Sequence, residues 1–118
     1  MSITGQVQEF VEKLSIPSHE IEKSSDLISI DRDYIIVIPT YDHKTTALIN
    51  EFIQHESNLS YCRGVVGSGN LAFGEDFTYT AKDISKQYNI PLLRQIEYSG
   101  SDYDVEQLEK ELKFIGIT

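Results

Sequence analysis

Tyr34-Ile35-Ile36-Val37-Ile38, closed by Pro39, is the stretch of sequence that decides the fold. A continuous run of β-branched and aromatic residues is typical of a strand that is covered on both faces. Proline lacks the backbone N–H that a central strand donates, so we expect the strand to end there. Strands covered on both faces belong to parallel sheets with helices on either side, and the run therefore predicts an α/β fold.

Strand-like and helix-like segments alternate on both sides of this run. Apolar periodicity predicts further strands near 19–22, at 63–66 and at 91–97, and helices at 6–14, 45–55, 76–88 and 103–114. Asp102 is the expected N-cap of the last helix. The alternation predicts a parallel sheet between two layers of helices, within one domain that spans residues 1–118.

Charge and composition narrow the classes of function. The net charge is −9, from 10 Lys and Arg against 19 Asp and Glu, which argues against binding to nucleic acid or to an anionic membrane surface. The chain shows no apolar run of bilayer length and no signal-peptide pattern, so we expect a cytoplasmic protein. Cys62 is the single cysteine and is expected to be a partly buried structural thiol. Acidity of this size serves solubility or favours a basic protein partner.

Three segments stand where ligands bind in open α/β sheets, beyond the carboxyl ends of strands or at a helix start. Residues 2–6 carry hydroxyls and a glycine before the first helix, which suits a phosphate, although such residues also serve as simple helix caps. Residues 39–43 include Tyr41, which covers a flat ligand or faces solvent, and His43, for which solvation is the simpler reading. Residues 67–74 contain three glycines, which allow a close approach of backbone to a ring, and Phe73 could stack there.

Taken together, the three segments outline a site for a phosphorylated aromatic cofactor, in outline a flavin mononucleotide. His19, His43 and His55 lack the spacing of metal ligands. The sequence around Gly67-Ser68-Gly69 is not the G-x-S-x-G pattern of a hydrolase nucleophile. The spacing of the glycines also differs from the dinucleotide fingerprint.

Specific motifs over nearly the whole chain resemble the NrdI family of flavodoxin-like proteins. The resemblance is carried by Gly64-Val65-Val66-Gly67-Ser68-Gly69-Asn70 with Phe73-Gly74 and Phe77, by Ile84–Tyr88 with Pro91-Leu92-Leu93, by Glu97, Ser99-Gly100 and Asp104-Val105, and by Ser2-x-Thr4-Gly5-x-Val7 with Phe10–Leu14. It implies a flavodoxin-like three-layer sandwich with a parallel sheet. The hydrophobic strand with which the family opens has no counterpart before Ser2, so we expect this central first strand to be missing here.

The resemblance also implies a cofactor and a site. By position it assigns the FMN phosphate to Ser2, Thr4, Gly5, Gln6 and Val7, one side of the ring to Pro39, Thr40 and Tyr41, and the other edge to Gly67, Ser68, Gly69, Asn70, Phe73 and Gly74. The chain departs from the family at Gln6, at Leu71-Ala72 and in the glycine-free segment 41–46. These departures bear on the flavin potential and on docking.

The role implied by the resemblance lies in class Ib ribonucleotide reductase. Such a protein, reduced by a flavodoxin reductase or similar donor, supplies a superoxide-level oxidant to the dimanganese small subunit, where a tyrosyl radical cofactor is assembled. It is a redox activator rather than an enzyme with its own organic substrate. Two alternatives remain open, a general flavodoxin for other redox partners and a degenerate interaction module that binds no flavin.

Overall fold

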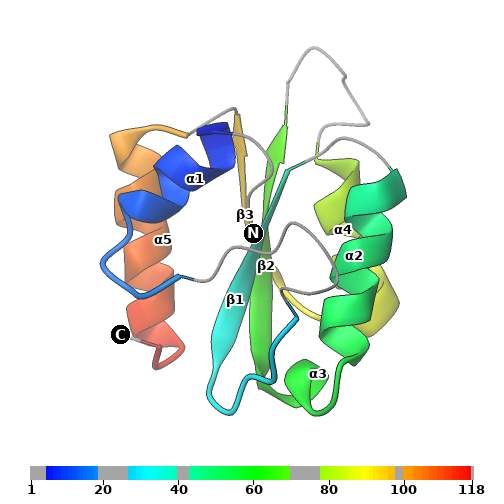
Figure 1. Cartoon of the computed structure of the whole chain (residues 1–118). Coiled ribbons are helices and arrows are strands. Elements are labelled where there is room, and N and C mark those ends of the chain that lie inside the picture. Colours follow the sequence, from blue (N-terminus) through cyan, green and yellow to red (C-terminus); the bar gives the residue numbers. More distant parts are fainter. Residues whose placement is uncertain (1–4, 19–26, 40–42, 70–77, 98–99, 118) are drawn as a thin grey trace.

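A three-stranded parallel sheet with helices on both faces forms the centre of the molecule (Figure 1). The computed structural model describes residues 5–18, 27–39, 43–69, 78–97 and 100–117. In chain order, its elements are α1 (Gly5–Glu12), β1 (Tyr34–Pro39), α2 (His43–Gln54), α3 (Asn58–Tyr61), β2 (Cys62–Gly69), α4 (Tyr79–Tyr88), β3 (Leu92–Glu97) and α5 (Asp102–Phe114).

The strands lie in the order β1-β2-β3, and both pairs are parallel. Helices α1 and α5 cover one face of the sheet and α2 and α4 cover the other (Figure 1). The three-layer, flavodoxin-like α/β fold expected from the sequence is therefore confirmed. The sheet of the described residues is smaller than the five strands of a flavodoxin sheet. Among these residues, no strand pairs with the outer edge of β1, which agrees with the expected lack of one strand.

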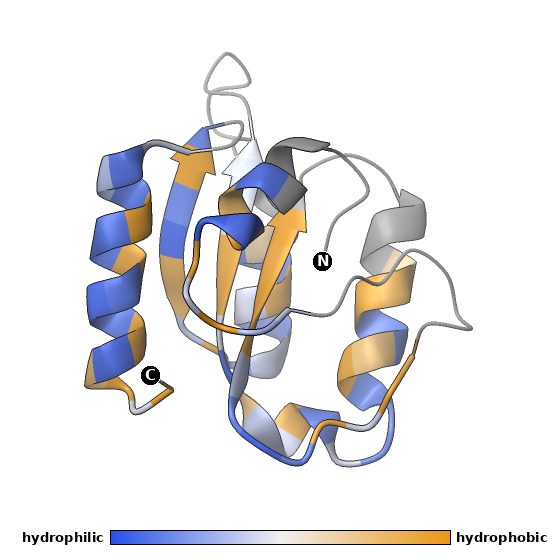
Figure 2. Cartoon of the chain, turned by 60° about the vertical axis from the view of Figure 1, so that its left-hand side comes forward, coloured by the Kyte–Doolittle hydropathy of each residue, from blue (hydrophilic) through white to orange (hydrophobic). Residues whose placement is uncertain are grey.

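The strand β1 separates two hydrophobic clusters. Ile36 and Ile38 belong to the cluster under α2 and α4, whereas Val37 belongs to the cluster under α1 and α5. All three side chains are buried, so the uninterrupted apolar run is explained by burial on both faces. Hydrophobic residues accordingly lie along β1 and on the inner sides of the helices, while the middle of β3 and the outer side of α5 are hydrophilic (Figure 2).

The helices bury the apolar stripes that their periodicity predicts. The buried apolar residues are Leu48, Ile49, Phe52 and Ile53 in α2, Ala81 and Ile84 in α4, and Leu108 and Leu112 in α5. None of the helices in the described part of the chain is long and apolar enough to cross a membrane.

Several boundaries differ from the sequence prediction. The strand β2 continues through Gly69, because Gly67, Ser68 and Gly69 pair with consecutive residues of β3 rather than forming a loop. The helix α4 begins at Tyr79, three residues later than predicted. The N-cap of α5 is Ser101, not Asp102, since the Ser101 hydroxyl accepts the Asp104 N–H in a capping box. The short helix α3 was not predicted, and the strand expected near 19–22 lies outside the described residues.

Candidate functional site

The carboxyl ends of the three strands meet at one edge of the sheet, which we call the carboxyl rim and define by Pro39, Gly69 and Glu97. Pro39 pairs with Ser68 of β2, and Gly69 pairs with Glu97 of β3. The predicted site residues at the ends of β1 and β2 are thus adjacent. Ligands of open α/β sheets bind at such an edge.

The helix α1 begins at the same end of the sheet to which the strand arrows point (Figures 1 and 2). The first N–H groups of a helix have no acceptor within the helix and carry a partial positive charge. The first turn of α1 contains no acidic residue that would neutralise this charge. The backbone N–H groups of Gly5, Gln6 and Val7 belong to this first turn, where the sequence predicts the phosphate.

Helix α1 is fixed at this place by Phe10. The Phe10 side chain is fully buried in the cluster with Val37, Val66 and Ile96. It also lies against Gly100, where an added Cβ would be 2.8 Å from Phe10 Cδ1. The contact joins α1 to the segment that follows β3, so the start of α1 and the ends of the strands form one packed unit.

Close packing of α4 against β2 requires a glycine at position 67. A Cβ on Gly67 would lie 2.7 Å from the Cβ of Ala81 and 2.8 Å from the Cβ of Thr78. The absence of a side chain lets α4 approach the sheet closely. Ser68 is buried beside it, and Gly69 is half-buried at the rim. Of these three predicted residues, Gly69 stands nearest the position of a ligand at the rim.

The described residues include only part of the predicted cofactor site. Gly5, Gln6 and Val7 lie in the first turn of α1, Pro39 ends β1, and Gly67, Ser68 and Gly69 end β2. The remaining predicted residues lie outside the described residues, and they are Ser2, Thr4, Thr40, Tyr41, Asn70, Phe73 and Gly74. The structure thus gives the backbone positions of seven predicted residues, and the cofactor-binding roles of all the predicted residues stay predictions.

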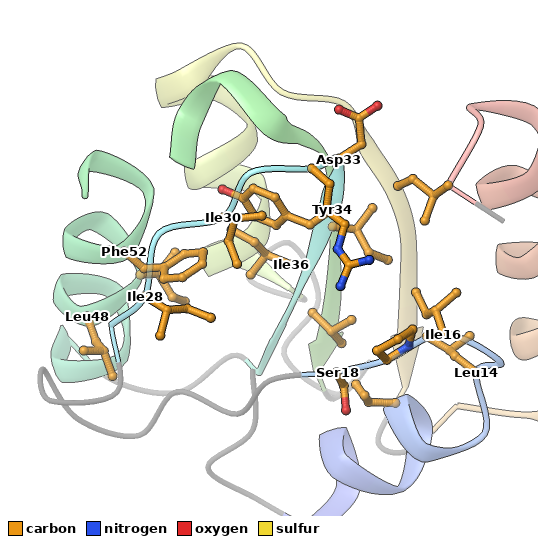
Figure 3. A pocket seen from close by; sticks show the side chains of 17 residues that line it. Leu14, Ile16, Ser18, Ile28, Ile30, Asp33, Tyr34, Ile36, Leu48 and Phe52 are labelled. Carbon is orange, nitrogen blue, oxygen red and sulfur yellow. The ribbon is translucent and has the colours of Figure 1, made fainter. Parts of the chain in front are cut away.

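A cavity of about 370 Å³ lies elsewhere, along the outer edge of β1 (Figure 3). Its walls come from both faces of the sheet, with Leu14 and Ile16 on one side and Leu48 and Phe52 on the other. Mostly apolar side chains line it, and none of the predicted cofactor residues is among them. The cavity is therefore not the predicted cofactor site.

Asn58 organises the wall of this cavity, and sequence reasoning missed it. The fully buried Asn58 side chain accepts the Ile30 N–H at 2.7 Å and donates to the carbonyls of Ile28 and Phe52, both at 2.9 Å. The Tyr34 hydroxyl donates to the Asn58 carbonyl at 2.7 Å. A buried asparagine needs such hydrogen-bond partners. The sequence does not reveal them, because these partners come from three separate segments of the chain.

Tyr34 and Cys62 lie together at the amino ends of β1 and β2, where they are paired in the register. Burial raises the pKa of the Cys62 thiol, and the backbone of Gly64 and the side chain of Tyr34 oppose this effect through hydrogen bonds. Burial also raises the pKa of Tyr34, and the neighbouring thiol adds to this effect. Both groups are therefore neutral near pH 7, as the expectation of a structural, half-buried Cys62 requires.

Ser101, Arg94 and Asp104 form a polar cluster where β3 meets α5. Arg94 contacts Asp104 Oδ1 through Nε at 2.8 Å and through its terminal nitrogen at 2.7 Å. Burial raises the pKa of Asp104, but hydrogen bonds from Ser101 and Arg94 outweigh it and hold the pKa below its usual range. The guanidinium also lies 5.5 Å from the centre of the Tyr103 ring. The cluster fixes the start of α5.

The chain is similar to known proteins over most of its length. The family model described as "NrdI Flavodoxin like" matches residues 1–110. A protein NrdI of Mycoplasma capricolum subsp. capricolum is 38% identical over 122 residues, which cover 94% of this chain and 76% of that protein. A protein NrdI of Mesoplasma florum is 36% identical, with 95% of this chain and 80% of that protein covered. One from Streptococcus pyogenes serotype M1 is 30% identical, with coverages of 92% and 71%.

Proposed function

This chain belongs to the NrdI flavodoxin-like family, and from this membership we propose that it binds FMN and activates a class Ib ribonucleotide reductase. The observation that carries the proposal is the match of the family model to residues 1–110. The carboxyl rim supports it, because a helix start without acidic residues and a glycine at a strand end face the same edge of the sheet.

The rim fits the chemical parts of FMN. The N–H groups of Gly5, Gln6 and Val7 would bind the phosphate, together with the hydroxyls of Ser2 and Thr4. Gly69, with no side chain, would let the backbone approach the ring edge. We propose that the rest of the ring is held by the other residues of the sequence prediction, which are Pro39, Thr40, Tyr41, Gly67, Ser68, Asn70, Phe73 and Gly74.

When bound, FMN would supply electron transfer and the reduction of oxygen to a superoxide-level oxidant. The protein would hold the ring, set its exposure to oxygen and present it to a partner. We propose that the partner is the dimanganese small subunit of the reductase, whose tyrosyl radical cofactor is assembled with this oxidant. A flavodoxin reductase or a similar protein would donate the electrons.

The charge of the chain supports docking to a basic surface of a protein partner. With a net charge of −9, it favours association with a basic surface and disfavours nucleic acids and anionic lipids. We place its action in the cytoplasm. The proposed role is that of a redox activator and electron carrier.

The proposal is tested by retention of flavin. The purified chain is saturated with FMN, desalted, and its visible spectrum recorded; riboflavin, which lacks the phosphate, serves as the matched comparison. We expect FMN to remain bound and riboflavin to bind at least about tenfold more weakly. A colourless protein after desalting with FMN would refute the cofactor proposal.

The partner is tested separately by passing the FMN-loaded chain over an immobilised dimanganese small subunit at low and high salt. We expect binding that weakens with salt, since opposite charges steer the encounter. A coloured protein with no affinity for the subunit would favour a general flavodoxin. A colourless protein that still binds the subunit would favour the interaction module.

A further inference from the structure

Thr78, at the start of α4, has an unfavourable backbone conformation and lacks the side-chain cap that is usual at this position. Its backbone is left-handed, with φ 55° and ψ 32°, a conformation that β-branched residues rarely adopt. It stands at the N-cap of α4, where threonine hydroxyls ordinarily accept a helix N–H, yet it makes no side-chain capping bond. A residue that combines a strained backbone with an unused capping hydroxyl is typical of a functional position.

The Thr78 hydroxyl is bound to the sheet instead. It donates to Gln95 Oε1 of β3 at 2.7 Å, and the Thr78 side chain is fully buried. Gln95 pairs in the register with Gly67, and the Cβ of Thr78 occupies the space beside Gly67 that a side chain there would need. Gly67, Gln95 and Thr78 thus form a three-residue contact that fixes the start of α4 against β2.

This contact lies two residues before the carboxyl rim. Gly67 is followed by Ser68 and then by Gly69, whose pairing partner Glu97 is likewise two residues beyond Gln95. A displacement of Thr78 is therefore transmitted to the strand end that the proposed function assigns to FMN. Gly69 and Thr78 are the described residues on either side of residues 70–77, and both contact β3, Gly69 through Glu97 and Thr78 through Gln95.

We propose that the Thr78–Gln95 hydrogen bond is a positioning device for the cofactor: it holds the strained Thr78 backbone so that Gly69 and the start of α4 keep the geometry that FMN needs. The inference rests on the proposed function and deepens it. Neither side chain is assigned a contact with FMN. Their effect passes through the backbone, and the bond is expected to matter for binding more than for folding.

Substitution of Thr78 by Val tests the device, with Thr78→Ser as the matched control. Val keeps the shape and the branching but removes the donor, whereas Ser keeps the donor. Gln95 is exposed, so its amide can bind water once the hydroxyl is gone. We therefore expect thermal unfolding of Thr78→Val close to that of the wild type, with FMN bound about tenfold more weakly and a shifted visible spectrum. Thr78→Ser should bind FMN as the wild type does.

A double-mutant cycle with Gln95→Leu completes the test. If the hydrogen bond is the cause, Gln95→Leu weakens FMN binding about as much as Thr78→Val, and the double variant is no weaker than either alone. Losses that multiply, or wild-type FMN affinity in Thr78→Val, would overturn the inference while the proposed function stands. Failure of the wild-type chain to retain FMN would instead overturn the proposed function itself.

Discussion

The Phe10 ring lies against Gly100 so closely that a Cβ on Gly100 would be 2.8 Å from Phe10 Cδ1. Gly100 has a φ of +70°, in the left-handed region that favours glycine. This contact connects α1, whose N-terminus we propose to bind the phosphate, with Gly100, which lies between β3 and α5. The fold and the proposed site therefore depend on the same packing.

Substitution of Gly100 by Ala should destabilise the protein by about 2–4 kcal/mol, since strain at positive φ and overpacking against Phe10 add together. Gly116→Ala is the matched control, because φ there is +89° and a Cβ would meet nothing within 4 Å. Its expected cost is about 1 kcal/mol. Urea unfolding measures both, and equal costs would show that the Phe10 contact contributes nothing.

Asn58→Ala should lower the free energy of unfolding by about 3 kcal/mol, because it leaves the Ile30 N–H and the Ile28 and Phe52 carbonyls without their partner. Gln54→Ala is the comparison, since the bond from Gln54 to the Tyr88 hydroxyl is exposed. We expect a cost below about 1 kcal/mol there. Chemical denaturation with a similar loss in both variants would argue against the role of Asn58.

Asp104→Asn should reduce stability by about 1 kcal/mol at pH 7, because the Arg94 and Ser101 bonds favour the ionised carboxyl. The folded pKa of Asp104 is depressed, so its contribution is present above the unfolded value of about 4 and is lost as the pH falls through the folded value. The difference between variant and wild type should therefore shrink in acid. Unfolding curves from pH 7 to pH 3 measure it, and a constant difference would contradict the assignment.

Gly69→Val should weaken FMN binding by at least about 100-fold, because the side chain would occupy the space of the ring edge. The fold should persist, since Gly69 is a paired strand residue and strand positions suit valine. Fluorescence titration with FMN measures the affinity and circular dichroism checks the fold. Gly116→Ala, far from the rim, should bind FMN normally; normal affinity in Gly69→Val would move the site elsewhere.

At three places the structure differs from what the local sequence pattern predicts or favours. Gly67-Ser68-Gly69 has turn composition, yet it continues β2, because β3 supplies backbone partners that no local signal reveals. Asp102 and Ser101 are both good N-caps, and the choice of Ser101 follows from Asp104, which also pairs with Arg94 of another element. Thr78 is an unfavourable residue for its conformation, and its contacts with Gln95 and Gly67 of the sheet leave no trace in the local sequence.

The sequence by itself determined the α/β class, the two-sided burial of β1 and the apolar stripes of α2, α4 and α5, because burial on a strand or helix leaves a periodic trace along the chain. Its motifs also determined the family. Only the tertiary structure decided that Gly67 serves the approach of α4, that Phe10 lies on Gly100 and that Thr78 binds Gln95. Each of these contacts joins residues of different elements, and their distances depend on how the layers pack.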